Sequence, residues 1–121
     1  MRLKSPKAKG SKFEREIAKS LRDAGLDLYA TRQILSGSAF GLPSDVKTSI
    51  PLAIEAKFQN NTSFKEWYKQ AERQANKSKI PVVVWKENYG LPFVFLKWDD
   101  LLEIMNFALI GGWADRLPFH K

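Results

Sequence analysis

Three residues near the middle of the chain carry side chains that together could hydrolyse a phosphodiester. Glu55, Lys57 and Gln59 lie in the segment 51–59, where polar residues alternate with apolar ones. This period of two predicts a strand with one apolar face and one polar face. Asp45 adds a second carboxylate a short distance upstream. Paired carboxylates attract a hard divalent cation, and a neighbouring lysine can position a water or stabilise charge on a phosphate. The pattern indicates metal-dependent phosphodiester cleavage.

The same residues also have ordinary structural interpretations. A Glu-x-Lys pair such as Glu55 and Lys57 is common on the exposed face of an edge strand, with no catalytic role. A third carboxylate, Glu14, lies four residues into the S-x-x-E pattern that begins at Ser11. That pattern is typical of a capping box, in which the glutamate bonds to the first turn of its own helix. From the residues alone, Glu14 is either a helix cap or an acidic site residue.

Positive charge is concentrated at the N-terminal end. Residues 1–22 contain eight Lys and Arg against two Glu, whereas the whole chain has a formal net charge of +7. A basic arm over residues 1–10 that leads into a basic helix indicates a polyanionic partner, most simply nucleic acid. An anionic membrane surface is the competing partner, but the first helix has no broad bulky apolar face to enter one.

Composition excludes several other classes. The chain has 121 residues, which we expect to form a single domain. It has no cysteine, so it has neither disulfides nor cysteine-bound zinc, and it suits a cytoplasmic, DNA-associated protein. The one histidine, His120, lies in the tail and supports no histidine-based site. No apolar run approaches the ~18 residues of a transmembrane helix.

The order of expected elements predicts an α/β fold, a mixed five-stranded β-sheet flanked by α-helices. Hydrophobic periodicity and Gly or Pro breaks set the boundaries. A serine- and glycine-rich loop over 36–41 precedes Asp45 and could approach a phosphate closely. The tail, residues 111–121, is irregular. Helices are expected over 11–24, 63–78 and from 99 onward, and strands over 26–34, just after 43, and over 51–59, 81–86 and 91–97.

Several short motifs occur together in a consistent order. They are Lys9-Gly-Ser-Lys-Phe-Glu-Arg-Glu16, then Arg32, then Ser36-Gly-Ser38, then Asp45, and finally Glu55-Ala-Lys57. In this order the chain resembles the archaeal-type Holliday junction resolvases of the PD-(D/E)xK nuclease superfamily. The resemblance covers residues 9 to about 86. It implies a restriction-endonuclease-like fold and a homodimer that cuts opposed strands of a four-way DNA junction.

The resemblance also implies roles for individual residues. Glu14, Asp45, Glu55 and Lys57 are the expected catalytic residues. The expected ligands of Mg²⁺, or of Mn²⁺ in its place, are the carboxylates of Asp45, Glu55 and Glu14 and the backbone carbonyl of Ala56. The remaining residues are expected to contact DNA: Lys9, Arg15, Arg32, Ser36, Ser38 and Gln59.

Two alternatives stay open at this stage. One is another nuclease of the same superfamily, with a nicking, flap-cutting or restriction-like activity. The other is a nucleic-acid-binding module without catalysis, in which the basic arm and helix supply phosphate contacts. Glu14, Asp45, Glu55 and Lys57 argue against a pure binder, because carboxylates beside phosphates weaken binding. The segment between Asp45 and Glu55 is short for the resolvase pattern, and residues 111–121 match no part of it.

Overall fold

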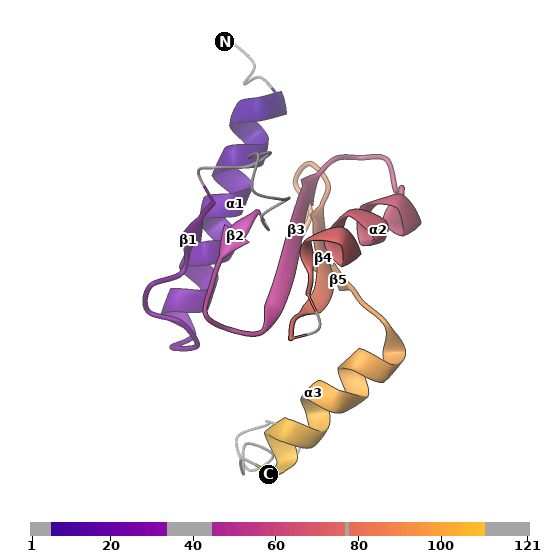
Figure 1. The fold of residues 1–121 in the computed structure, drawn as a ribbon. Coiled ribbons are helices and arrows are strands. Elements are labelled where there is room, and N and C mark those ends of the chain that lie inside the picture. The colour runs from indigo at the N-terminus through magenta and orange to yellow at the C-terminus, as the bar shows by residue number, and fades with distance from the viewer. Residues whose placement is uncertain (1–5, 34–44, 77, 111–121) are drawn as a thin grey trace.

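The computed structural model describes residues 6–33, 45–76 and 78–110, and it shows an α/β arrangement (Figure 1). Helices α1 and α2 lie on opposite sides of the strands, and α3 extends away from them (Figure 1). The expected α/β class is confirmed, and the arrangement is consistent with a restriction-endonuclease-like fold. The loop containing Ser36 and Ser38 and the tail over 111–121 lie outside the described residues.

Helix α1 spans Pro6–Asp23 and begins five residues earlier than the sequence predicts. The expected capping box at Ser11 is wrong, because Ser11 lies inside the helix. Proline suits the first turn of a helix, since its fixed φ is helical and its missing N–H would have no partner there. The helix ends at Asp23, and Gly25 follows with φ +74°, as expected for the glycine after a helix end. The Leu26 N–H donates to the Leu21 carbonyl at 3.0 Å, the long-range bond of a Schellman motif.

A short two-stranded ladder follows α1. Strand β1 (Thr31–Arg32) pairs antiparallel with β2 (Val46–Lys47). The expected strand over 26–34 is therefore much shorter than predicted. The cause is Asp27, whose carboxylate accepts from the backbone N–H of Tyr29 at 2.9 Å and so turns the chain before β1 begins.

The second sheet has three strands in the order β3-β4-β5. Strand β3 (Leu52–Phe58) runs parallel to β4 (Ile80–Lys86), which pairs antiparallel with β5 (Phe93–Phe95). Helix α2 (Phe64–Gln74) forms the crossover between the two parallel strands. The expected single five-stranded sheet is thus divided in two. The sheets meet where the Asp45 N–H donates to the Ile54 carbonyl at 2.9 Å.

The two faces of β3 support two separate cores. On one face, α1 packs on the sheet through Phe13, Ile17 and Ala18, which contact Val46 and Ile54. On the other face, α2 packs through Trp67, Tyr68 and Ala71 against β4, around the buried Val83. Because β3 alternates, the residues between its apolar positions, Glu55 and Lys57, face the α2 side.

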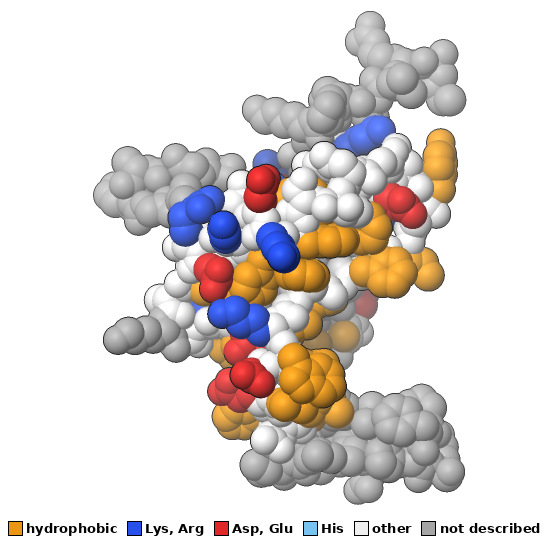
Figure 2. Space-filling model, turned by 90° about the vertical axis from the view of Figure 1, so that its right-hand side faces the viewer, with side chains coloured by type: hydrophobic (Ala, Val, Ile, Leu, Met, Phe, Trp, Pro, Cys, Tyr) orange, Lys and Arg blue, Asp and Glu red, His pale blue; other side chains and the backbone are white. Residues whose placement is uncertain are grey.

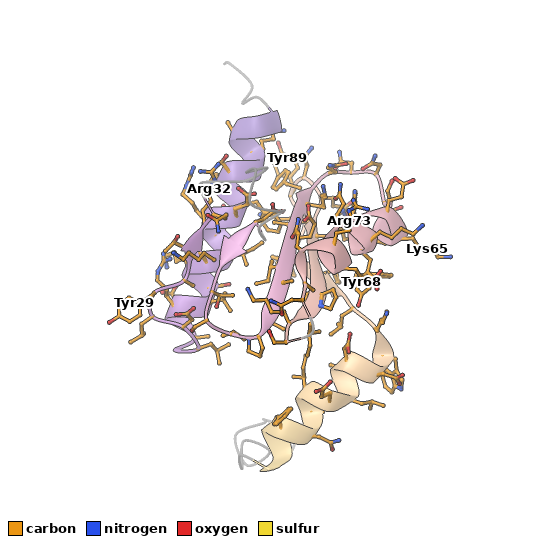
Figure 3. All side chains as sticks on the ribbon, in the orientation of Figure 1. Tyr29, Arg32, Lys65, Tyr68, Arg73 and Tyr89 are labelled. Carbon is orange, nitrogen blue, oxygen red and sulfur yellow. The ribbon has the colours of Figure 1, made fainter. Side chains whose placement is uncertain are left out.

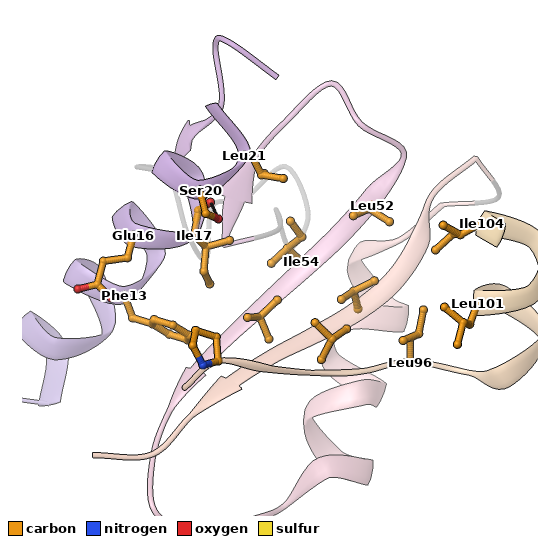
Figure 4. A pocket seen from close by; sticks show the side chains of 14 residues that line it. Phe13, Glu16, Ile17, Ser20, Leu21, Leu52, Ile54, Leu96, Leu101 and Ile104 are labelled. Carbon is orange, nitrogen blue, oxygen red and sulfur yellow. Dashed lines mark hydrogen bonds between the residues drawn. The ribbon is translucent and has the colours of Figure 1, made fainter. Parts of the chain in front are cut away.

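Helix α3 (Trp98–Ile110) leaves an apolar pocket of about 540 Å³ between itself, α1 and the sheet (Figure 4). The pocket lies on the α1 face, lined by side chains such as Phe13 and Ile54, and so on the opposite face from Glu55. Apolar side chains also stay exposed beside α3, with Phe93 61% and Trp98 69% exposed. Figure 2 shows hydrophobic side chains gathered on one face among lysines and arginines. Among the helices of the described ranges, none is long and apolar enough to cross a membrane.

Candidate active site

Asp45 is held tightly at the junction of the two sheets. Its backbone carbonyl accepts from the Gln33 N–H at 2.9 Å, and its own N–H donates to Ile54 on β3. Its side chain then turns back onto the same strand, where Oδ2 accepts from the Ala56 N–H at 2.7 Å. These three bonds place the Asp45 carboxylate against β3 at the level of Glu55. The sequence prediction that the two acidic residues converge is consistent with this geometry.

Glu55 is the more buried of the two carboxylates, with the residue only 5% exposed. Its Oε1 lies 3.3 Å from the Lys57 ammonium, two residues along the same face of β3. Its Oε2 accepts from the side-chain Nε2 of Gln74, at the end of α2, at 2.7 Å. The side chain of Lys57 is 19% exposed, so the ion pair is partly open to solvent. A substrate phosphate could therefore approach the ammonium from outside.

The surroundings of Asp45 disfavour its charged form. Burial is the main cause, and the negative charges of Glu55 and then Glu14 add to it, so that the pKa of Asp45 rises from 3.8 to about 7. The Ala56 N–H and the charge of Lys57 act in the opposite direction and are outweighed. The site therefore concentrates more negative charge than Lys57 neutralises, and a bound cation would relieve that excess.

Glu14 lies near this cluster but turns toward a different partner. Its Oε1 accepts from the Arg32 Nε at 2.9 Å, and the two side chains are 17% and 28% exposed. Figure 3 shows Arg32 on β1 beside α1. The alternative of a helix cap is wrong, because Glu14 lies in the helix interior and bonds across to a strand. Within the residues that the structure describes, no three His, Cys, Asp or Glu side chains are grouped closely enough to hold a metal ion. The role of Glu14 as a third metal ligand stays a prediction.

The chemistry of the donors fits a hard divalent cation all the same. Asp45 and Glu55 supply carboxylate oxygens, the ligands that Mg²⁺ and Mn²⁺ prefer, and burial followed by the nearby charges of Glu55 and Glu14 raises the pKa of Asp45. Mg²⁺ commonly binds through one or two carboxylates and keeps several waters, so a pair of acidic residues suffices. The backbone carbonyl of Ala56 as a further ligand stays a prediction.

The residues expected to contact DNA lie in different environments. Arg15 is exposed on α1, and Gln59 is exposed where β3 ends. The Lys9 ammonium lies 5.9 Å from the centroid of the Phe58 ring. Arg32 is engaged by Glu14. The structure thus brings Lys9 toward the end of β3, whereas Ser36 and Ser38 are outside its described part, and contact of any of these residues with DNA stays a prediction.

One residue of the site was not predicted from the sequence. Gln70 and Gln74 share one face of α2 at a spacing of four, a pattern visible in the sequence. That pattern gives no reason to connect Gln74 with Glu55, nineteen positions earlier. The contact depends on how the crossover helix lies against β3. Sequence periodicity cannot supply that information.

Asp45 lies just before β2, and its carboxylate bonds to β3, the strand that carries Glu55 and, two residues later, Lys57. Two converging carboxylates followed by such a lysine are the defining arrangement of a PD-(D/E)xK nuclease site. Comparison with known protein families agrees. The family described as "phage putative PDDEXK endonuclease" matches residues 5–110, and the chain belongs to this family. No curated protein and no solved structure gives a significant match. The family places the protein among the PD-(D/E)xK nucleases, which generally use divalent metals.

Proposed function

We propose that this protein is a metal-dependent DNA endonuclease that resolves four-way junctions as a homodimer. The observation that carries the catalytic part is the arrangement of Asp45, Glu55 and Lys57. The Asp45 carboxylate, held against β3, converges with that of Glu55, and the lysine ammonium lies 3.3 Å from Glu55. The family match supports the reaction class, and the sequence resemblance to archaeal-type resolvases supports the substrate.

Each residue has a separate role in this proposal. Asp45 and Glu55 would hold Mg²⁺, joined by the Ala56 carbonyl and by Glu14. Once bound, the cation would polarise the phosphate and lower the pKa of a water molecule beside it. Lys57 orients the attacking water or neutralises charge that develops on the phosphate. For Glu14 to serve the cation, its ion pair with Arg32 has to open, and a DNA phosphate is a suitable new partner for the guanidinium.

Substrate binding is assigned to the basic side of the molecule. The lysines and arginines of α1 supply sequence-independent phosphate contacts, which suit recognition of DNA by shape. The residues proposed to contact DNA are Lys9, Arg15, Arg32, Ser36, Ser38 and Gln59.

Junction resolution requires two active sites held at a fixed distance, and so a second copy of the chain. The apolar side chains exposed along β5 and α3, including Phe93 and Trp98, support such an assembly. Burial of this surface in a homodimer would stabilise both copies. Analytical ultracentrifugation of the free protein measures this directly, and the proposal predicts twice the monomer mass.

The direct test is a gel assay on a synthetic four-way junction and on a linear duplex that contains the same arm sequences. Each DNA is incubated with the protein and Mg²⁺, and in parallel with EDTA. The proposal predicts paired symmetric nicks in the junction, little cleavage of the duplex, and no cleavage in EDTA. Equal cleavage of both substrates would leave the active-site assignment intact. It would show that the substrate is duplex DNA rather than the junction specifically. Binding without cleavage would contradict the catalytic assignment.

A further inference from the structure

Gln74 makes a contact that the proposed catalytic roles leave unexplained. It is the last residue of α2, and its side-chain Nε2 donates to Glu55 Oε2 at 2.7 Å. This bond joins the crossover helix directly to the proposed metal site. The other oxygen of Glu55 lies against Lys57, so each carboxylate oxygen has its own donor from the protein.

The kind of donor matters for a buried carboxylate. Glu55 is 5% exposed, so water cannot replace a lost hydrogen bond freely. A second lysine or arginine here would add positive charge and compete with a metal ion for the same oxygens. A neutral amide instead fixes the orientation of Glu55 and leaves its negative charge available to a cation. Donors of this kind behind a ligating carboxylate are a general feature of metal sites.

The other end of the same amide argues against a packing role. The Gln74 Oε1 is buried and has no hydrogen-bond partner in the described structure. A buried acceptor without a partner is destabilising, and an apolar side chain would avoid that cost. Flipping the amide would not help, because Oε1 would then face the negatively charged Glu55. The part of the Gln74 amide that matters is therefore its Nε2 donor, which bonds to Glu55.

We propose that Gln74 is a positioning residue of the cation site, holding the Glu55 carboxylate in one orientation for metal binding. This inference rests on the proposed function, since it assigns a partner to the same site. It goes beyond that function because it predicts a defect in metal affinity that is measurable without DNA and without catalysis. Gln74 acts only through Glu55 and does not touch the substrate.

The test compares Gln74→Met with Gln70→Met. Methionine keeps the length and helix propensity of glutamine and removes the amide. Gln70 lies four residues earlier on the same helix, and its Oε1 is also buried without a partner, which makes it a matched control. Mn²⁺ alone, without DNA, is titrated into each protein and the free ion is followed by electron paramagnetic resonance. Melting in EDTA is recorded for every variant.

We expect Gln74→Met to weaken Mn²⁺ binding by about 10- to 100-fold, the usual effect of losing a partner of a metal ligand. Gln70→Met should bind Mn²⁺ like the wild type and melt in EDTA within a few degrees of Gln74→Met. If Gln74→Met does not fold, Gln74→Asn is used in its place. Asparagine keeps the amide but is one methylene too short to reach Glu55, so weaker Mn²⁺ binding is again expected.

Three outcomes would overturn the inference in distinguishable ways. Wild-type affinity for Mn²⁺ in a folded Gln74 variant would remove the positioning role and leave the proposed nuclease intact. Equal losses of affinity in the Gln74 and Gln70 variants would assign both residues to helix packing. A wild-type protein that binds no Mn²⁺ and cleaves no DNA would instead overturn the proposed function, and this inference with it.

Discussion

The backbone N–H of Ala56 donates to the Oδ2 of Asp45 at 2.7 Å, so one proposed metal ligand is anchored by the strand that carries the other. Ala56 directly follows Glu55 in β3, and this bond therefore sets the spacing of the two carboxylates. The arrangement gathers negative charge at one buried point before any cation or substrate is present. Stability, catalysis and metal binding therefore all depend on this point. Each of them is tested by a different measurement.

Asp45→Asn should stabilise the metal-free protein. Burial and the charges of Glu55 and Glu14 disfavour the Asp45 carboxylate, and asparagine keeps an oxygen for the Ala56 N–H without the charge. In EDTA at about pH 8, we expect the melting temperature to rise by about 4 °C, the shift that ~1 kcal/mol produces in a domain of this size. Differential scanning calorimetry measures this. A lower melting temperature for Asp45→Asn would show that the carboxylate is not strained.

Lys57→Met should separate catalysis from binding. The Lys57 ammonium lies beside Glu55, and the proposed function assigns it to the reacting phosphate or water. Its removal should lower the single-turnover cleavage rate by roughly 10²–10³, the effect of losing one stabilising group in an active site. DNA affinity, measured by fluorescence anisotropy in Ca²⁺, should change by less than about tenfold. Lys86→Met, one strand away, is the matched control and should retain the wild-type rate. Lost affinity with an unchanged rate would make Lys57 a binding residue.

Asp27 should make stability depend on pH far from the active site. Its carboxylate accepts from Thr48 at 2.7 Å, from the Ser49 N–H at 2.8 Å and from the Tyr29 N–H, and these bonds lower its pKa from 3.8 to about 2. Because the folded pKa lies below the unfolded value, the stabilisation is complete above about pH 4 and is lost as the pH falls through about 2.

Asp27→Asn should therefore unfold at lower urea concentration than the wild type at about pH 7. The difference between the two proteins should shrink as the pH approaches 2. Urea titrations followed by circular dichroism measure both. Asp23→Asn, at the exposed end of α1, is the control and should differ little from the wild type at either pH. Equal midpoints for the Asp27 variant and the wild type at neutral pH would contradict this role.

The elements set by local pattern were predictable from the sequence. Alternation in 51–59 located β3 and placed Glu55 and Lys57 on one face, and Gly25 marked the end of α1 correctly. The boundaries of elements failed where a single residue with its own backbone preference was given too little weight. Asp27 shortened the expected strand before β1, and Pro6 allowed α1 to begin ahead of the supposed cap at Ser11.

In the candidate site, too, local relationships were predictable and long-range contacts were not. The convergence of Asp45 with Glu55 was predictable, because a short connection joins Asp45 to the strand that carries Glu55. The contacts between Arg32 and Glu14, and between Gln74 and Glu55, were not. Both pairs join elements far apart in the sequence, and which partner a side chain selects depends on helix placement. The division of the strands into two sheets was not predicted either.

The most direct test of the central claim is the cleavage rate of Glu55→Gln in Mg²⁺ on labelled junction and duplex DNA. Glutamine keeps the size of Glu55 and removes the charge that binds the cation. Glu66→Gln, on the exposed first turn of α2, removes a carboxylate from outside the site and serves as the control. We predict that Glu66→Gln cleaves like the wild type, whereas Glu55→Gln loses about 10³-fold or more in rate while remaining folded. Full Mg²⁺-dependent cleavage by Glu55→Gln would contradict the assignment of the active site.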